Sequence, residues 1–288
     1  MKKYMFGIVM TLGVFITLSV LLYPTVSDYL NSRSQSRVVA RYFDDVVHMD
    51  DEKPQRLLKA AREYNRKLLK NNYRFKFTEQ ETTEYRSLLN TGGDVMGVLV
   101  IDKINVKLPI YHGTDEGVLH AGVGHIQGSS LPVGGTGTHS FITGHRGLPS
   151  ATLLSNLNKM AEGDIFILYV LGETLTYQVD QIQTVEPHEV ETLAIDPDMD
   201  YCTLVTCTPY GVNSHRLLVR GQRVENADTA DWNSIYAGAK RLDKLIIILI
   251  FTVPVLPVLI IYIMFKCVKI RKGGKIQCLN GLYPFYSP

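Results

Sequence analysis

The sequence predicts a mainly β fold: a closed barrel of short strands, preceded by helices and flanked by one transmembrane helix at each end. Three observations predict it. Residues 5–23 and 245–265 are apolar stretches of about the 20 residues needed to cross a ~30 Å hydrocarbon core. Residues 28–70 show apolar positions at helical spacing. From residue 95 the apolar period shifts to about two, in short segments separated by turn residues, as in an all-β barrel.

The N-terminal stretch, residues 1–27, is interpreted as a membrane anchor. It begins with the basic pair Lys2 and Lys3, as a signal peptide also would, but no small-residue cleavage site follows the apolar run. We therefore expect an anchor that stays attached, with a cleaved signal peptide as the alternative.

Residues 245–265 contain no charged residue and are interpreted as a second transmembrane helix, which tolerates its two prolines better than a soluble helix would. A basic tail, residues 266–288, follows this span. Positive charge therefore lies on the terminal side of each span. By the positive-inside rule both termini are in the cytoplasm, and the region between the spans is on the extracellular side of the cell membrane.

Residues 28–94 are predicted to form a helical stalk and a segment leading into the barrel. Two amphipathic helices account for residues 28 to about 70, and the second begins near Asp50 or Asp51 with Pro54 in its first turn. Residues 71–94 are polar, mixed in charge and end in Thr-Gly-Gly-Asp, so we expect a flexible connection there.

The barrel is expected to occupy residues 95–228, and a linker over residues 229–244 joins it to the second span. One short helix is predicted within it, at residues 153–160. The predicted strands span residues 97–101, 106–111, 140–143, 164–170, 174–185, 201–207 and 215–224.

Composition argues against several classes of function. The net charge of +2 and the scatter of basic residues give no footprint for nucleic acid. No group of Cys, His, Asp and Glu has metal-ligand spacing, and the glycines within 134–137 lack the Gly-Lys-Ser/Thr ending of a phosphate loop. We therefore expect no cofactor and no metal. The run Leu-Pro-Val-Gly-Gly at 131–135 is interpreted as a turn.

Two cysteines, Cys202 and Cys207, belong to the predicted extracellular region. They lie on one strand, so their Cα atoms are ~16 Å apart at about 3.3 Å per residue, whereas a disulfide needs less than about 7 Å. We therefore expect two free thiols. Cys202 is predicted to pack in the core, and Cys207 to lie at the strand end, beside Pro209.

Cys207, Arg216 and His145 are the candidate catalytic residues. A short loop joins two predicted strands, with Cys207 ending the first and Arg216 beginning the second, so the two side chains would face each other across a hairpin. A neighbouring cation favours the thiolate, which is the nucleophilic form of cysteine. A base is available in His145, which stands between Gly144 and Gly147 in a loop after an apolar strand.

Other residues compete for these roles. His139 begins the same strand as His145, and His215 adjoins Arg216 but points to the opposite face of its strand. Arg146 is the lesser alternative to Arg216 and is treated as structural.

Two blocks of sequence carry these residues. The first reads Ile-Thr-Gly-His-Arg-Gly over 142–147 and continues as Leu-Pro-Ser-Ala; the second reads Thr-Leu-Val-Thr-Cys-Thr-Pro-Tyr-Gly over 203–211, followed by Arg216. Together they resemble the sortases, most closely the class C, pilin-polymerising sortases of Gram-positive bacteria. The resemblance covers residues 95 to 225. It implies an eight-stranded sortase barrel and selects His145 as the family's histidine.

The resemblance also implies a membrane-anchored cysteine transpeptidase. Cys207 would attack the Thr–Gly carbonyl of an LPxTG-like sorting motif, His145 would protonate the departing amine, and Arg216 would donate to the oxyanion. The acceptor would be a pilin lysine, so the expected partners are pilin subunits and the membrane, and not nucleic acid. Two alternatives remain: a cell-envelope cysteine peptidase that passes the thioester to water, and a non-catalytic assembly platform.

The sequence departs from the class C pattern in the lid before the barrel, where an Asp-Pro-aromatic motif usually covers the active site. Residues 72–85 contain no Asp-Pro, and the single such dipeptide, at 196–197, lies inside the barrel. Tyr73, Phe75 or Phe77 could replace the aromatic residue, but no acidic residue stands at the matching offset. We therefore expect an open or loosely covered site.

Overall fold

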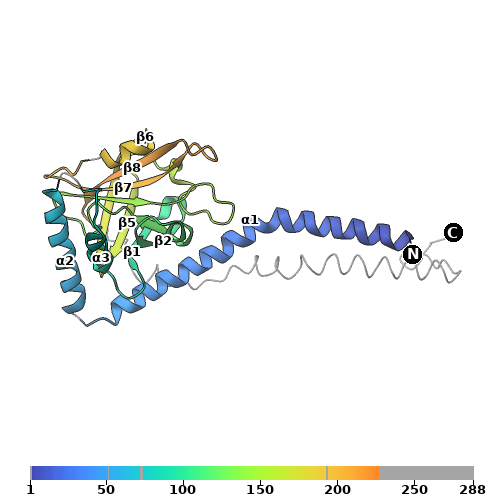
Figure 1. The fold of residues 1–288 in the computed structure, drawn as a ribbon, viewed down its shortest axis with the longest axis horizontal. Coiled ribbons are helices and arrows are strands. Elements are labelled where there is room, and N and C mark those ends of the chain that lie inside the picture. Colours follow the sequence, from blue (N-terminus) through green and yellow to red (C-terminus); the bar gives the residue numbers. More distant parts are fainter. Residues whose placement is uncertain (1, 51, 72–73, 193, 227–288) are drawn as a thin grey trace, which may run out of the picture. The chain divides into compact units, whose positions relative to one another are not determined.

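The computed structural model describes residues 2–50, 52–71, 74–192 and 194–226 (Figure 1). The predicted linker, second transmembrane helix and basic tail, residues 229–288, lie outside this part of the chain. The described residues divide after Val26 into two units, and those from Ser27 to Asn226 belong to the unit that contains the barrel.

The predicted anchor and the first stalk helix form one continuous helix, α1 (Lys2–Val47), which passes through Pro24 without a break. Among the described residues, α1 is the one helix long and apolar enough to cross a membrane; its candidate stretch begins at Gly7 and reaches a mean hydropathy of 2.0. The structure therefore contains a helix that matches the predicted N-terminal transmembrane segment in length and composition.

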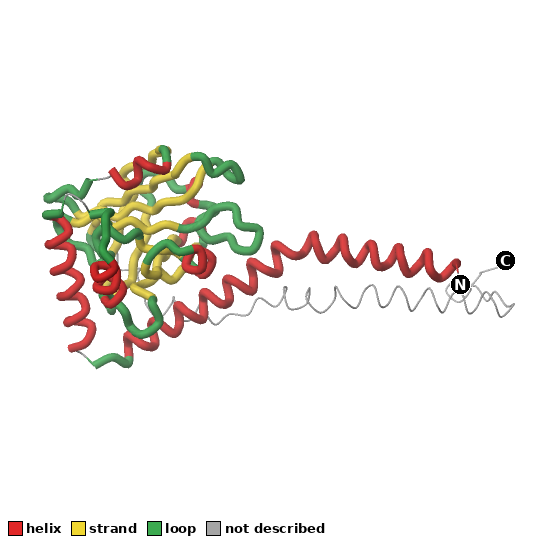
Figure 2. The backbone as a smooth tube through the Cα atoms, viewed as in Figure 1, coloured by secondary structure: helices red, strands yellow, loops and turns green. Residues whose placement is uncertain are grey.

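Eight strands close a mixed barrel in the order β1–β2–β3–β4–β7–β8–β6–β5. The strands are drawn in yellow in Figure 2. Neighbouring strands are antiparallel, except that β2 pairs with β3 and β4 with β7 in parallel. The strands are β1 (Val95–Ile101), β2 (Val106–His112), β3 (Val123–His125), β4 (Thr138–Thr143), β5 (Ile165–Val170), β6 (Glu173–Val185), β7 (Asp200–Thr208) and β8 (His215–Val224). The barrel prediction is confirmed. β3 alone has no predicted counterpart, because three residues are too few to show a period.

The second half of α1 packs on the outside of the barrel. Val39, Tyr42 and Phe43 form a buried cluster with side chains of β1 and β5. The Tyr42 hydroxyl donates to Met96 O at 3.0 Å and accepts from Leu171 N at 2.8 Å. Since the helix covers its outer face, β1 is buried along its whole length, and not on alternate residues only.

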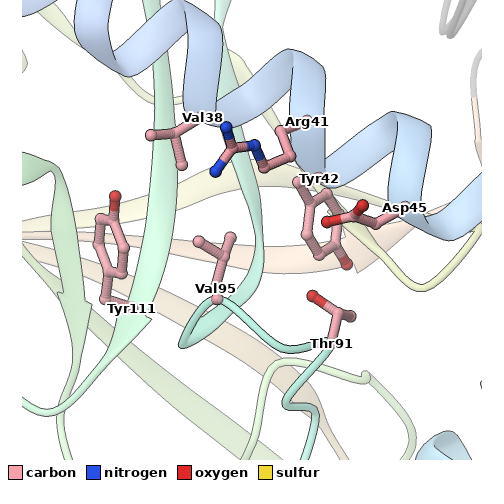
Figure 3. A pocket seen from close by; sticks show the side chains of 8 residues that line it. Val38, Arg41, Tyr42, Asp45, Thr91, Val95 and Tyr111 are labelled. Atoms are coloured by element: carbon pink, nitrogen blue, oxygen red, sulfur yellow. The ribbon is translucent and has the colours of Figure 1, made fainter.

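A pocket of about 120 Å³ opens beside this contact (Figure 3). Val38, Arg41 and Asp45 of α1 line it on one side, and Val95 and Tyr111 of the barrel on the other. None of the candidate catalytic residues lines this pocket.

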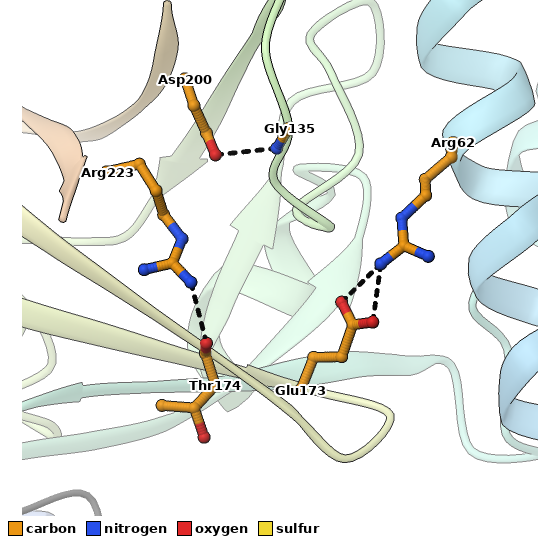
Figure 4. A network of polar contacts seen from close by, with 6 residues as sticks. All are labelled: Arg62, Gly135, Glu173, Thr174, Asp200 and Arg223. Carbon is orange, nitrogen blue, oxygen red and sulfur yellow. Dashed lines mark hydrogen bonds and ion pairs between the residues drawn. The ribbon is translucent and has the colours of Figure 1, made fainter. Parts of the chain in front are cut away.

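A second helix, α2 (Glu52–Leu69), packs against the main core through Leu58 and Ala61. Its buried Asn65 donates to Leu131 O at 3.0 Å and accepts from Leu131 N at 2.7 Å. Arg62 donates to both carboxylate oxygens of Glu173 at 2.6 and 2.8 Å (Figure 4). The Asn65 bonds fix α2 to the turn that begins at Leu131, and the Arg62 bonds fix it to the start of β6.

The turn at 131–135 is held from the barrel side as well. Gly134 and Gly135 have φ values of 62° and 110°, which favour glycine. The Gly135 amide donates to the Asp200 carboxylate at 2.7 Å, and nearby Arg223 donates to Thr174 O at 3.2 Å (Figure 4). The run Leu-Pro-Val-Gly-Gly is thus an internal turn of the fold.

The flexible connection expected over residues 71–94 is corrected by the structure, because it contains the helix α3 (Glu79–Ser87). Its N-terminus is a capping box: Thr78 Oγ1 accepts from Glu81 N at 3.2 Å, and the Glu81 carboxylate accepts from Thr78 N at 2.7 Å. Tyr85 is buried, and its hydroxyl bonds His125 Nδ1 at 2.9 Å and accepts from Gly113 N at 3.0 Å. The Thr-x-x-Glu spacing was the signal for this helix.

The remaining helices are short. Of the helix predicted at residues 153–160, the single 3₁₀ turn η2 (Leu157–Lys159) is present, and the rest consists of turns. The additional elements are α4 (Glu116–Ala121), η1 (Asp102–Ile104) and η3 (Pro187–Thr192).

Candidate active site

The hairpin of β7 and β8 places Cys207 and Arg216 side by side. They are direct partners in the antiparallel ladder, and Thr208 pairs with His215 one step nearer the loop. In the loop the amides of Val212 and Asn213 both donate to Pro209 O, at 3.2 and 3.0 Å. Asn213 and Gly211 adopt positive φ values of 59° and 75°, which explains the Pro/Gly/Asn composition. The predicted pairing of Cys207 with Arg216 across a hairpin is therefore present in the structure.

The parallel pairing of β4 with β7 brings His145 to the same rim. The register pairs Thr143 with Val205 and continues beyond the end of β4, where Gly144 N donates to Val205 O at 3.1 Å. Thr206 Oγ1 donates to Gly144 O at 2.8 Å. Arg146 Nη1 donates to Thr208 Oγ1 at 3.0 Å. These bonds flank His145 on one strand and Cys207 on the other, so the two residues are level with each other.

Arg146 thus contributes to the frame of the site. Its bond to Thr208 fixes the segment that carries His145 against the end of β7. This contact agrees with its interpretation as a structural residue.

Arg216 lies at the mouth of the hairpin. Its Nη1 group donates to the carbonyl oxygens of Asn213 and His215, at 3.2 and 3.1 Å. Among the described residues, its Nε and Nη2 groups have no hydrogen-bond partner. The guanidinium therefore keeps N–H donors available at the rim that Cys207 occupies.

His145 stands next to a second histidine, His120, which sequence reasoning did not single out. The two ring centroids are 5.4 Å apart, and His120 Nε2 is 3.6 Å from the Glu116 carboxylate on α4. Partial burial lowers the pKa of His145 below its ordinary value, nearby His120 lowers it further, and Glu116 opposes both. No pattern marked His120 among eight histidines, because the six-residue helix that presents it gives too short a period.

The rival histidines are engaged elsewhere. His139 is buried, with Nδ1 2.9 Å from Ala194 O and Nε2 2.7 Å from Thr203 Oγ1. Because a carbonyl accepts only, Nδ1 carries the proton and Nε2 accepts from the threonine. Burial lowers the pKa of His139 to about 4, so it remains neutral at pH 7. His215 is exposed and bonds Ser214 Oγ at 2.9 Å.

The two cysteines of the barrel, Cys202 and Cys207, differ in the predicted way. Both are free thiols; Cys202 is fully buried in the main core, and Cys207 is half-buried. Burial raises the pKa of the Cys202 thiol well above its usual value, and nearby Asp200 adds to this effect. Cys202 is therefore an unreactive core residue.

The segment before α3 packs beside the loop that follows β3. Arg74 O and the rings of Phe75 and Phe77 surround Gly128, whose φ is 94° and where an added Cβ would lie 2.3 Å from Arg74 O. The Gly128 loop pairs with β4 near its start, since Ser130 N donates to His139 O at 2.9 Å. His139 and His145 are six residues apart, or ~20 Å along an extended strand at about 3.3 Å per residue. Phe75 and Phe77 thus pack near the far end of β4 from Cys207.

The described residues contain no group of three or more His, Cys, Asp and Glu side chains that could hold a metal ion. The site consists of a thiol on β7, a guanidinium on β8 and an imidazole in the segment that follows β4. This set can form an acyl-enzyme, transfer a proton and stabilise an oxyanion.

Comparison with known proteins shows which family this chain resembles. Residues 99–224 match the Sortase domain family. Among curated proteins, Sortase D of Bacillus subtilis (strain 168) is 29% identical over 135 residues, a match that covers 46% of this chain and 65% of the relative. Sortase A of Streptococcus agalactiae serotype III (strain NEM316) is 26% identical over 198 residues, covering 66% of this chain and 79% of the relative.

Solved structures are more similar. Sortase C1 from Streptococcus agalactiae is 51% identical with a TM-score of 0.64, covering 66% of this chain and 100% of that one. Sortase C of Streptococcus pneumoniae, described with reference to pilin substrate specificity, is 44% identical with a TM-score of 0.60, covering 66% and 97%. Clostridium perfringens sortase C, solved with the C-terminal cell wall sorting motif, is 40% identical with a TM-score of 0.59, covering 66% and 99%.

Proposed function

The chain belongs to the sortase family, and on that basis we propose that it is a pilin-polymerising transpeptidase in which Cys207, His145 and Arg216 are the catalytic residues. One observation carries the proposal: the ladders β4–β7 and β7–β8 bring His145 and Arg216 to either side of Cys207 at one rim of the barrel. The class C neighbours support the pilin substrate, since one is described with pilin specificity and one with a sorting motif.

In the first half-reaction, the Cys207 thiol gives its proton to His145, and its Sγ attacks the threonine carbonyl carbon of an LPxTG-like motif. The Thr–Gly C–N bond breaks, the glycine amine leaves with a proton from His145, and the acyl group remains on Cys207 as a thioester. Arg216 donates hydrogen bonds to the oxyanion of the tetrahedral intermediate.

In the second half-reaction, the amine of a pilin lysine attacks the thioester carbon. His145 takes a proton from this amine, the C–S bond breaks, and an isopeptide bond joins two subunits. His145 passes this proton to Cys207 Sγ, which restores the thiol, and no cofactor enters the balance.

We propose further that α1 anchors the enzyme in the cell membrane with the barrel on the extracellular side and both termini in the cytoplasm. The apolar start of α1 and the basic residues at the chain ends support this orientation. Substrates held by membrane tails of their own would then meet the enzyme at the same surface.

The test uses the full-length protein in detergent and a fluorogenic LPxTG peptide, with and without a lysine-containing pilin domain. We expect a thioester adduct on Cys207 by intact mass, and an isopeptide product when the pilin is present. Hydrolysis at the same rate with and without pilin would establish the cysteine peptidase instead. If no adduct forms, and Cys207 is alkylated no faster than free cysteine, the protein is an assembly platform.

A further inference from the structure

α1 reaches the segment that follows His145 through two hydrogen bonds. Asp28 Oδ1 accepts from the Thr152 amide at 2.6 Å, and Asn31 Nδ2 donates to Ser150 O at 2.8 Å. The two side chains are three positions apart, so they lie on one face of the helix. Together they hold neighbouring residues of one loop. Thr152 is 124 residues from Asp28 in the sequence, and Ser150 is 119 residues from Asn31.

That loop is tied directly to His145. Leu154 N donates to His145 O at 3.2 Å, and Gly147 N donates to Ser155 Oγ at 3.0 Å. Leu154 is fully buried and lies so close to Gly144 that a Cβ there would be 2.9 Å from its Cδ1. The loop is thus a short packed link with the α1 contacts at one end and His145 at the other.

The same helix is fixed to the barrel further along its length. Tyr42 bonds Met96 O and Leu171 N, and Val39 and Phe43 pack on β1 and β5. From Asn31 to Tyr42 the helix advances ~16 Å at about 1.5 Å per residue. α1 therefore connects a rigid contact on the barrel wall to the His145 loop at the rim.

We propose that Asp28 and Asn31 are positioning residues that hold the His145 loop in its productive place, so that the rate of the sortase depends on the docking of α1. The inference rests on the proposed function, since it takes His145 as the catalytic histidine. The physical reason for this dependence is that the imidazole transfers a proton only from within hydrogen-bond distance of the reacting group. A misplacement of about 1 Å can lower the rate ~10²-fold.

Two isosteric substitutions separate the hydrogen bonds from charge and shape. Asp28→Asn keeps an oxygen that accepts from Thr152 N, whereas Asn31→Asp removes the donor and sets a carboxylate against the Ser150 carbonyl. Asp44→Asn and Ser34→Asp are the matched controls, because they make the same charge changes on exposed positions of α1.

The experiment measures kcat and KM for sorting-peptide cleavage by the full-length protein in detergent, with melting temperatures recorded in parallel. We expect Asn31→Asp to lower kcat about tenfold while KM changes less than twofold, and Asp28→Asn and both controls to stay within twofold of the parent. Asp28→Ala, which lacks an acceptor, is expected to behave like Asn31→Asp. If Asn31→Asp does not fold, Asn31→Ala replaces it under the same criterion.

A kcat for Asn31→Asp within twofold of Ser34→Asp overturns the proposal, as does an Asp28→Asn variant as slow as Asp28→Ala. A loss that appears in the melting temperature and not in kcat also overturns it, because the contacts would then be merely structural. His145→Ala distinguishes a failure of the proposed function from a failure of the positioning role. If His145→Ala remains active, the proposed function is wrong. If His145→Ala is inactive and Asn31→Asp has a normal kcat, the positioning role alone is wrong.

Discussion

Cys207 and Arg216 are paired residues of the β7–β8 ladder, so their side chains leave the same face of the hairpin at the barrel rim. One nitrogen of the guanidinium, Nη1, donates to Asn213 O and His215 O of the hairpin. The remaining N–H donors are the ones that a tetrahedral intermediate on Cys207 could engage. This relationship makes the roles of the two residues separately testable.

The first prediction concerns the two thiols. Cys207→Ala is expected to abolish thioester formation and product, whereas Cys202→Ala is expected to keep most of the activity and lower stability by about 1 kcal/mol through lost packing. Intact mass and turnover of a sorting peptide measure the first effect, and urea unfolding the second. Product formation by Cys207→Ala at the parent rate would exclude it as the nucleophile.

The second prediction concerns the guanidinium. Arg216→Lys is expected to lower kcat by ~10²–10³, because an ammonium cannot reproduce two parallel N–H donors. Arg220→Lys, on the same face of β8, is the control: its bidentate pair with Asp180, at 2.7 and 3.1 Å, is structural, so the loss should appear in the melting temperature. A lysine variant at 216 with near-parent kcat would reduce Arg216 to an electrostatic role.

The third prediction concerns the aromatic segment at Gly128. Phe75→Ala and Phe77→Ala are expected to change the alkylation rate of Cys207 and the peptide cleavage rate by less than threefold, because both rings pack toward the far end of β4. Point variants are used because a larger deletion would remove the buried Tyr85 of α3. A tenfold rise in both rates, equivalent to ~1.4 kcal/mol of closure, would reveal a working lid.

The fourth prediction concerns the protonation of His145. Since His120 lowers the pKa of His145 and Glu116 raises it, His120→Asn should move the His145 limb of the pH–rate profile to higher pH, and Glu116→Gln should move it lower. Arg146, Cys207 and Arg216 are unchanged in both variants. Identical pH–rate profiles in the two variants would show that His120 and Glu116 do not affect the pKa of His145.

The fifth prediction concerns acid stability. Burial lowers the pKa of both His125 and His139 from 6.5 to about 4, so between these two pH values the unfolded chain binds more protons than the folded one. Stability is therefore fully present above pH ~6.5 and falls as the pH drops to about 4, by roughly 3 kcal/mol per histidine. Urea unfolding from pH 7.5 to 4.5 measures the slope, which should flatten in His125→Gln but not in the exposed control His48→Gln.

Much of the barrel and its rim could be predicted because the signals were local. Alternation of apolar residues located the strands, and the Pro/Gly/Asn loop after Cys207 indicated the hairpin that pairs it with Arg216. The placement of His145 beside Cys207 required the family resemblance, because the parallel β4–β7 pairing is not readable from either strand alone.

What could not be predicted depends on contacts between distant segments. Nothing in the sequence near Asp28 indicates that its carboxylate accepts from Thr152, and His120 meets His145 through a helix too short to show a period. α3 is the exception, since its Thr78–Glu81 capping box was visible in the sequence.

The parallel pairing of β4 with β7 also affects the order in which the chain folds. The bonds that align the histidine and the thiol join residues 62 positions apart, and both β5 and β6 lie between them in sequence. Such high contact order makes their meeting a late event, because the entropy of closing a long loop is lost before the contacts compensate for it. A one-residue slip between the two strands would turn the reactive groups to opposite faces. With the catalytic roles proposed above, an unfolded chain therefore carries a thiol without its acid–base partner, and acyl transfer begins only when the barrel has closed.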